Sequence, residues 1–142
     1  MVENFPRPGL VRRLAALFYD SILLVALLMA ATVPVLLVTD GQPIAPGNPW
    51  YRLYLFVLAA SFFCFFWIRG GQTLGMRAWR LRVVTNDGGP LDLRRCVIRF
   101  LAGIVSIAFA GLGFLWIAID REGRAWHDRL SRTQVVLLPG NR

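Results

Sequence analysis

Two long apolar stretches are the strongest constraint on the fold of this chain. Residues 14–38 contain one acidic residue in 25, and residues 100–119 contain no charged residue in 20. Runs of this length predict segments that lie in a membrane. Of the 142 residues, 56% are hydrophobic and 17% are charged, whereas about a quarter are charged in an ordinary soluble domain. These patterns exclude a secreted disulfide scaffold, a disordered tail and an ordinary water-soluble enzyme domain.

The charge of the chain comes from arginine alone. The 16 basic residues include no lysine, and 8 acidic residues leave a net charge of +8. Because the arginines flank the apolar runs, we interpret them by the positive-inside rule and as contacts for anionic lipid headgroups, not for nucleic acid. Cys64 and Cys96 form no CxxC pair and have no zinc spacing, so we expect two unpaired cysteines at different depths.

The order of apolar and polar segments predicts one domain, 1–142, that is integral to a membrane. We expect a multi-pass protein with its N-terminus in the cytoplasm, since the loop after the first apolar run has no arginine before Arg52. The expected parts are an N-terminal arm (1–11), a first helix (12–38), an outer loop (39–50), a second helix (50–68), a cytoplasmic basic segment (69–96) and a basic tail (120–142).

The basic segment and the tail carry the signals for the remaining small elements. Within 69–96 the sequence predicts a short amphipathic helix over 76–81, with Leu74, Ala78 and Leu81 on one face and suited to lie in the membrane interface. Residues 81–85 and 133–138 are rich in β-branched residues and predict two strands. These strands can pair only if both lie on the same side of the membrane.

The side of the membrane on which the second strand lies depends on the third apolar segment, residues 97–119, for which two topologies are possible. As a plain third span, it would place the arginine-rich tail outside. As a re-entrant hairpin broken at 111–113, it would return the tail to the cytoplasmic side, as the positive-inside rule favours. The expected fold is therefore mostly α-helical and integral to the membrane. It has two transmembrane helices, a third segment that spans or re-enters, and a small cytoplasmic β-pair.

Asp20 is the most informative charged residue, because a carboxylate inside a span is costly and usually has a partner. Arg13 lies on the same helix face seven residues earlier, with the small Ala16 between them. Arg99, near the start of the third apolar segment, is the other candidate partner. Two interpretations follow for Asp20: a proton or cation site, or a structural Arg–Asp lock between helices. We expect Arg13, Asp20 and Asp128 to converge on the cytoplasmic side, with Arg99 competing for the same carboxylates.

Other polar motifs give no sign of catalysis. His127, the only histidine, has no other metal ligands near it in the sequence and predicts a hydrogen-bonded structural residue. Asp128 is expected to cap a turn or pair with an arginine. The glycine-rich run 70–75 lacks the ending of a phosphate loop and predicts a tight turn out of the second helix. We therefore expect no enzyme activity, no catalytic residues, no cofactor and no metal site.

Together these motifs resemble the RDD family of bacterial membrane proteins, from about residue 10 to 138. The resemblance rests on Arg13-x-x-Ala16-x-x-x-Asp20, on Gly71-Gln72-Thr73-Leu74-Gly75, on the strand at 81–84 followed by Asp-Gly, and on the run from His127 to Thr133 before a Val-Val strand. The arginine and two aspartates that name the family match Arg13, Asp20 and Asp128. The chain departs from the family at Met76, where members often have a lysine.

The resemblance implies a location in a bacterial cytoplasmic (inner) membrane. It also implies an architecture more than an activity, since transport of ions or small ligands is only suggested for the family. One hypothesis is transport of protons, cations or small ligands through the Arg–Asp site. The alternative is a non-catalytic accessory or scaffold subunit of a larger membrane complex. Two or three short elements cannot enclose a pathway alone, so transport would require a homo-oligomer or a partner.

Overall fold

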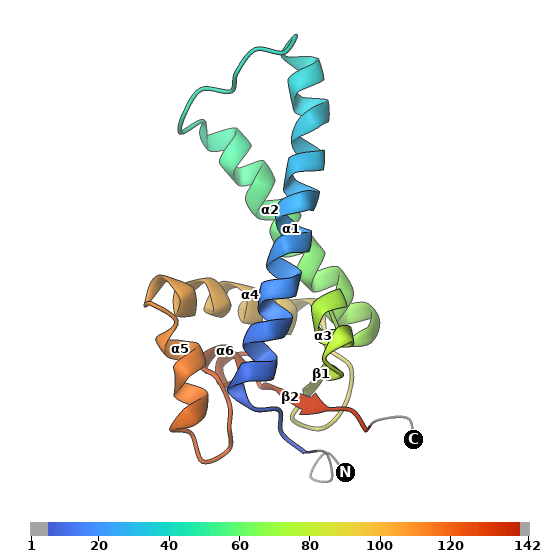
Figure 1. The fold of residues 1–142 in the computed structure, drawn as a ribbon, viewed down its shortest axis with the longest axis vertical. Coiled ribbons are helices and arrows are strands. Elements are labelled where there is room, and N and C mark those ends of the chain that lie inside the picture. Colours follow the sequence, from blue (N-terminus) through green and yellow to red (C-terminus); the bar gives the residue numbers. More distant parts are fainter. Residues whose placement is uncertain (1–5, 140–142) are drawn as a thin grey trace.

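The computed structural model describes residues 6–139 and consists mainly of helices (Figure 1). The expected arm therefore lies in part outside the described residues, as does the end of the tail. The two longest helices are α1 (Leu10–Val38) and α2 (Pro49–Gly70), and both are long and apolar enough to cross a membrane. This confirms the two predicted spanning helices by length and composition. Asn48 caps α2 by accepting hydrogen bonds from the backbone of Trp50 and Tyr51, and Pro49 begins the helix.

All elements after α2 gather around the N-terminal half of α1 (Figure 1). They are α3 (Leu74–Ala78), β1 (Leu81–Thr85), α4 (Leu93–Ala108), α5 (Leu112–Leu115), the 3-10 helix η2 (Trp116–Ala118), α6 (Trp126–Leu130) and β2 (Thr133–Leu137). Strands β1 and β2 pair antiparallel, with Leu81 opposite Leu137 and Thr85 opposite Thr133. The two predicted strands are thus a pair, and the tail returns to the segment that follows α2.

The third apolar segment is not a straight span. Helix α4 ends at Ala108, and the helices that follow are bent from it by 105°. Ala110 and Gly111 at the break both have positive φ, 54° and 75°. Gly113 allows α5 to fold back closely, because a Cβ there would lie 2.7 Å from the Cβ of Ser106. The prediction that the third apolar segment breaks near 111–113 is therefore confirmed, and an unbroken third helix is excluded. The bent pair of helices has the shape of a broken span or a re-entrant loop.

The short helix after α2 differs from its prediction. It covers Leu74–Ala78 instead of 76–81, because Arg80 has a left-handed φ of 58° that ends the helix before Leu81. Leu81 belongs to β1. Helix α3 also packs on α1 with Gly75 and Met76 buried, so it does not simply lie flat on a membrane surface.

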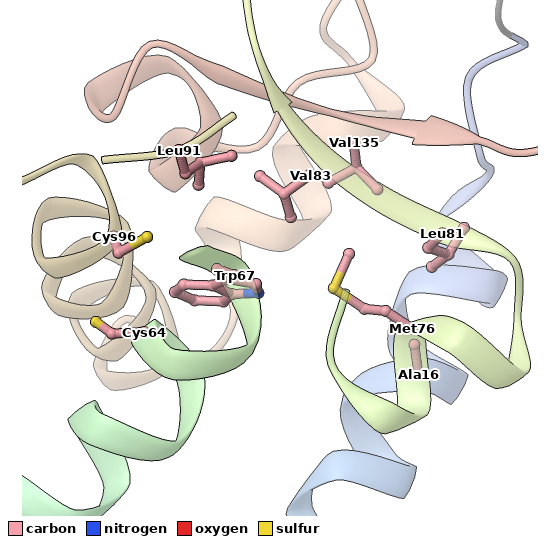
Figure 2. Close-up of a cluster of buried hydrophobic side chains, with 9 residues drawn as sticks. All are labelled: Ala16, Cys64, Trp67, Met76, Leu81, Val83, Leu91, Cys96 and Val135. Atoms are coloured by element: carbon pink, nitrogen blue, oxygen red, sulfur yellow. The ribbon is translucent and has the colours of Figure 1, made fainter. Parts of the chain in front are cut away.

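An apolar core ties together the elements at the end of the molecule that holds the strands (Figure 1 and Figure 2). Its members come from α1, α2, α3, the sheet, α4 and the turn before α4. Cys64 and Cys96 are both free and both belong to this core, so the expectation that they lie at different depths is wrong. The cluster consists of Ala16, Cys64, Trp67, Met76, Leu81, Val83, Leu91, Cys96 and Val135.

Candidate functional site

Asp128 is the centre of a buried ion cluster that joins four elements. Its Oδ2 accepts a hydrogen bond from Arg13 Nη1 of α1 at 2.6 Å, and its Oδ1 accepts one from Arg99 Nη1 of α4. The backbone N–H of Ala125 donates to Oδ2 at 3.1 Å. Arg99 also donates to the hydroxyl of Thr133, in β2, at 2.8 Å. Asp128 is fully buried, and this cluster therefore holds α1, α4, α6 and β2 together.

The electrostatics of the cluster fix Asp128 as an anion. Although burial opposes its ionisation, the Arg99 and Arg13 guanidiniums beside it hold the pKa of the Asp128 carboxyl well below its usual range. Breaking such a pair by removing one partner leaves an uncompensated buried charge. Asp128 is therefore a permanent counter-ion of the two arginines.

Asp20 has different partners from those the sequence suggested. Its carboxylate accepts hydrogen bonds from the Thr73 hydroxyl and from the backbone N–H of Gly75, the latter at 2.8 Å. Among residues 6–139, none of the ion pairs involves Asp20. The expected Asp20–arginine lock is thus replaced by bonds to neutral donors at the start of α3. Arg13 and Asp20 do share the buried face of α1, on either side of Ala16.

The glycine-rich motif after α2 builds this contact. Gly71 ends α2 with a φ of 67°, and its carbonyl accepts from Val83 N at 2.6 Å, which ties the motif to β1. Gln72 Nε2 donates to the carbonyl of Leu81 at 2.7 Å. Thr73 caps α3 by accepting from Met76 N at 3.2 Å. The motif therefore makes the turn out of α2 that was predicted, and its hydrogen bonds also join α2 to β1 and to Asp20 of α1.

Gly75 permits the close approach of α3 to α1. A Cβ at this position would overlap the carbonyl oxygen of Ala16 and lie 2.9 Å from Cγ of Asp20. Any larger residue would push the two helices apart, because Cβ contacts under about 3 Å do not occur without a shift. Met76, the next residue, is buried in the apolar core.

His127 is buried and uncharged. Burial, together with the neighbouring Arg99 charge, lowers the pKa of His127 to about 3. Its Nδ1 has no hydrogen-bond partner among the described residues, and its Nε2 lies 3.6 Å from Asp128 Oδ1. Its ring packs on Phe114 with centroids 4.7 Å apart. The hydrogen-bonded role expected for His127 is therefore wrong at Nδ1, and packing holds the ring instead.

A cavity of about 140 Å³ lies between α1, α2, α3 and α4. Arg13, Asp20, Arg99 and His127 all contribute to its wall, so three of the four charged residues predicted to converge meet at one space together with His127. Asp128 sits behind the two arginines. The rest of the wall is mostly apolar and includes Leu17, Phe63, Phe100, Ile104, Ile107 and Phe114.

Sequence reasoning missed Trp67 and Thr133. Trp67 lines the cavity, and the Arg99 guanidinium lies over its ring at 5.2 Å from the centroid. The position of Trp67 at the end of the second apolar run, next to the glycine motif, is the signal that could have linked it to Arg99.

The family model for the RDD family matches residues 7–132 of this chain. That match covers Arg13, Asp20, Arg99, His127 and Asp128 and most of the chain. No curated protein and no solved structure matches it.

Proposed function

Because this chain belongs to the RDD family, we propose that it is a transport-related membrane protein in which Asp20 takes up and releases a proton. The contrast between the two buried carboxylates carries this proposal. Asp128 touches two guanidiniums, whereas Asp20 touches only a hydroxyl and a backbone N–H. Within residues 6–139, the charge of Asp20 therefore has no counter-ion in contact with it, and the residue is only 2% exposed.

A proton fits Asp20 better than a metal cation does. Hard cations require several oxygen ligands at once. Within residues 6–139, no group of three or more acidic, histidine or cysteine side chains gathers to hold a metal ion. The other polar atoms around the cavity are mainly N–H donors of Arg13, Arg99 and Trp67. Intramembrane carboxylates with this kind of setting commonly belong to proton relays.

The arginine distribution supports the orientation of the proposed protein. The basic segment that follows α2, the arginines after α5 and the N-terminus of α1 all lie at one end of the molecule (Figure 1). The loop 39–48 at the other end contains no arginine. We place the arginine-rich end in the cytoplasm of a bacterial cell, beside anionic lipids of the inner membrane.

Two spanning helices cannot enclose a path across a membrane, so the proposal includes a homo-oligomer. Gentle detergent extraction followed by native electrophoresis tests this part. A homogeneous homo-oligomer supports transport by this chain alone. A fixed association with other proteins supports the alternative, an accessory subunit of a larger complex, and counts against transport by this chain alone.

Reconstituted liposomes test the role of Asp20. An internal pH-sensitive dye reports proton movement after an external acid pulse. We expect proton movement with the natural chain, and its loss in Asp20→Asn. Asp92→Asn is the matched control, because Asp92 is an exposed cap of α4 and asparagine caps helices equally well. The proposal fails if the natural chain moves no protons at any pH, or if Asp20→Asn moves them at the same rate.

A further inference from the structure

We infer that the cavity beside Asp20 binds an amphiphile with a compact oxyanion head, of the fatty-acid carboxylate type, and that Asp20 takes up a proton as this anion enters. This inference rests on the proposed function, since it uses Asp20 as the proton-exchanging group. It adds the chemical class of the ligand and a reason for the proton to accompany it.

The shape of the cavity suits the head and first carbons of such a molecule. Its volume of about 140 Å³ is close to that of a protein cavity that holds benzene, about 150 Å³. Ile104 and Ile107 line the cavity and are also 40% and 58% exposed at the surface of α4. The cavity therefore opens along an apolar face, where a hydrocarbon tail can extend.

Three polar groups around the cavity are N–H donors that lack an acceptor. Arg13 Nε, Arg99 Nε and Trp67 Nε1 are buried N–H groups that have no hydrogen-bond partner in the part of the chain that the structure describes. Figure 2 shows the indole nitrogen of Trp67 turned toward Met76, across the space between α2 and α3. All three side chains are at least nine-tenths buried. Buried donors without partners are costly, and a carboxylate offers two acceptor oxygens. An ammonium head would only add more donors.

The charges around the cavity couple the anion to a proton. Arg13 from α1 and Arg99 from α4 are positive, and Asp128 from α6 compensates one of them. His127 from α6 is neutral, and the groups from α2 and α3 that face Asp20 or the cavity, including Trp67 and Thr73, carry no charge. With Asp20 ionised the site is neutral overall, and with Asp20 protonated it carries one positive charge. Only the protonated form has the charge that matches a bound carboxylate.

Quenching of tryptophan fluorescence in nanodiscs of neutral lipid tests the site. The probe is 2-bromodecanoate, which stays ionised at neutral pH and carries its heavy atom next to the carboxylate. We expect saturable quenching that is missing in Trp67→Phe, so the difference between the two proteins isolates binding in the cavity. Methyl 2-bromodecanoate is the matched neutral probe, and we expect no Trp67-dependent quenching from it. Equal quenching by acid and ester, or none that depends on Trp67, would overturn the inference.

Asp20→Asn tests the proton coupling at the same site. We expect this variant to bind 2-bromodecanoate about tenfold more tightly at neutral pH, because it removes a nearby negative charge. A pH indicator in weak buffer should show about one proton taken up per anion bound by the natural chain, and none by Asp20→Asn. Unchanged affinity together with unchanged proton uptake would refute the coupling. These equilibrium measurements need no gradient, so they can fail or succeed independently of proton movement in liposomes.

Discussion

Replacing Gly75 by alanine tests the close contact between α3 and α1 on which the Asp20 site depends. The added Cβ would overlap the carbonyl oxygen of Ala16 and lie 2.9 Å from Cγ and 3.0 Å from Oδ1 of Asp20. Neither neighbour is the free end of a flexible side chain, because one is backbone and the other is held by Thr73. Helix α3 must therefore move away from α1.

Three effects determine how much this movement of α3 lowers the free energy of unfolding. Overpacking of a tight contact costs about 1–3 kcal/mol. The hydrogen bond from Gly75 N to the Asp20 carboxylate is stretched as well, and a bond to a charged group contributes about 1.5–3 kcal/mol. Alanine returns about 0.5–1 kcal/mol through its better helix propensity. The sum predicts that the free energy of unfolding falls by about 2–5 kcal/mol.

Unfolding of the purified protein in detergent, followed by circular dichroism against denaturant, measures this change. Gly103→Ala is the matched control, because Gly103 is also helical and a Cβ there meets nothing within 4 Å. We expect Gly103→Ala to be as stable as the natural chain or slightly more stable. Equal stability of Gly75→Ala and Gly103→Ala would refute the close packing of α3 on α1.

Three further changes test the ion cluster, the histidine and the glycine motif by the same unfolding measurement. Asp128→Ala should cost about 3–5 kcal/mol, and a double-mutant cycle with Arg99→Ala should show strong coupling. Between about pH 6.5 and about pH 4, stability should fall with falling pH by up to ~1.4 kcal/mol per pH unit, because unfolded His127 binds a proton that the folded, neutral His127 does not. His127→Phe should remove this part of the slope. The further loss at lower pH should remain, because Asp128 is then protonated in the unfolded chain but not in the folded one. Gly71→Ala, at a φ of 67°, should cost more than about 1 kcal/mol. Additive effects of Asp128→Ala and Arg99→Ala would contradict the ion pair, and a pH slope that is unchanged in His127→Phe would contradict the neutral, buried His127. Unchanged stability of Gly71→Ala would contradict the need for glycine at that φ.

The elements that depend on local signals could be predicted from the sequence. The apolar runs give α1 and α2, and the β-branched stretches give β1 and β2, because periodicity and propensity act over neighbouring residues. The break after α4 could also be predicted. A plain third span would put the arginine-rich tail outside the cell, against the positive-inside rule, and Gly111 within the apolar run offers a place for the chain to turn back. The end of α3 was not, because it depends on the left-handed backbone of Arg80.

The partners of the charged residues could not be predicted in the same way. Arg13 and Asp20 share a helix face, as their spacing predicts, but seven residues separate them by about 10 Å along the axis. Each therefore meets a different neighbour: Arg13 reaches Asp128 of α6, and Asp20 reaches the start of α3. Which element lies beside each turn of α1 is set by tertiary packing. For the same reason the sequence shows Gly75 but not the Ala16 carbonyl that requires it.

The central claim is that Asp20 exchanges a proton while Asp128 remains a fixed anion. Infrared difference spectroscopy of the reconstituted protein during a pH titration tests it most directly, because the protonated carboxyl group has its own C=O band. We predict a band that grows as the pH falls, that is absent in Asp20→Asn and that persists in the control Asp92→Asn. A band that persists unchanged in Asp20→Asn would contradict the account.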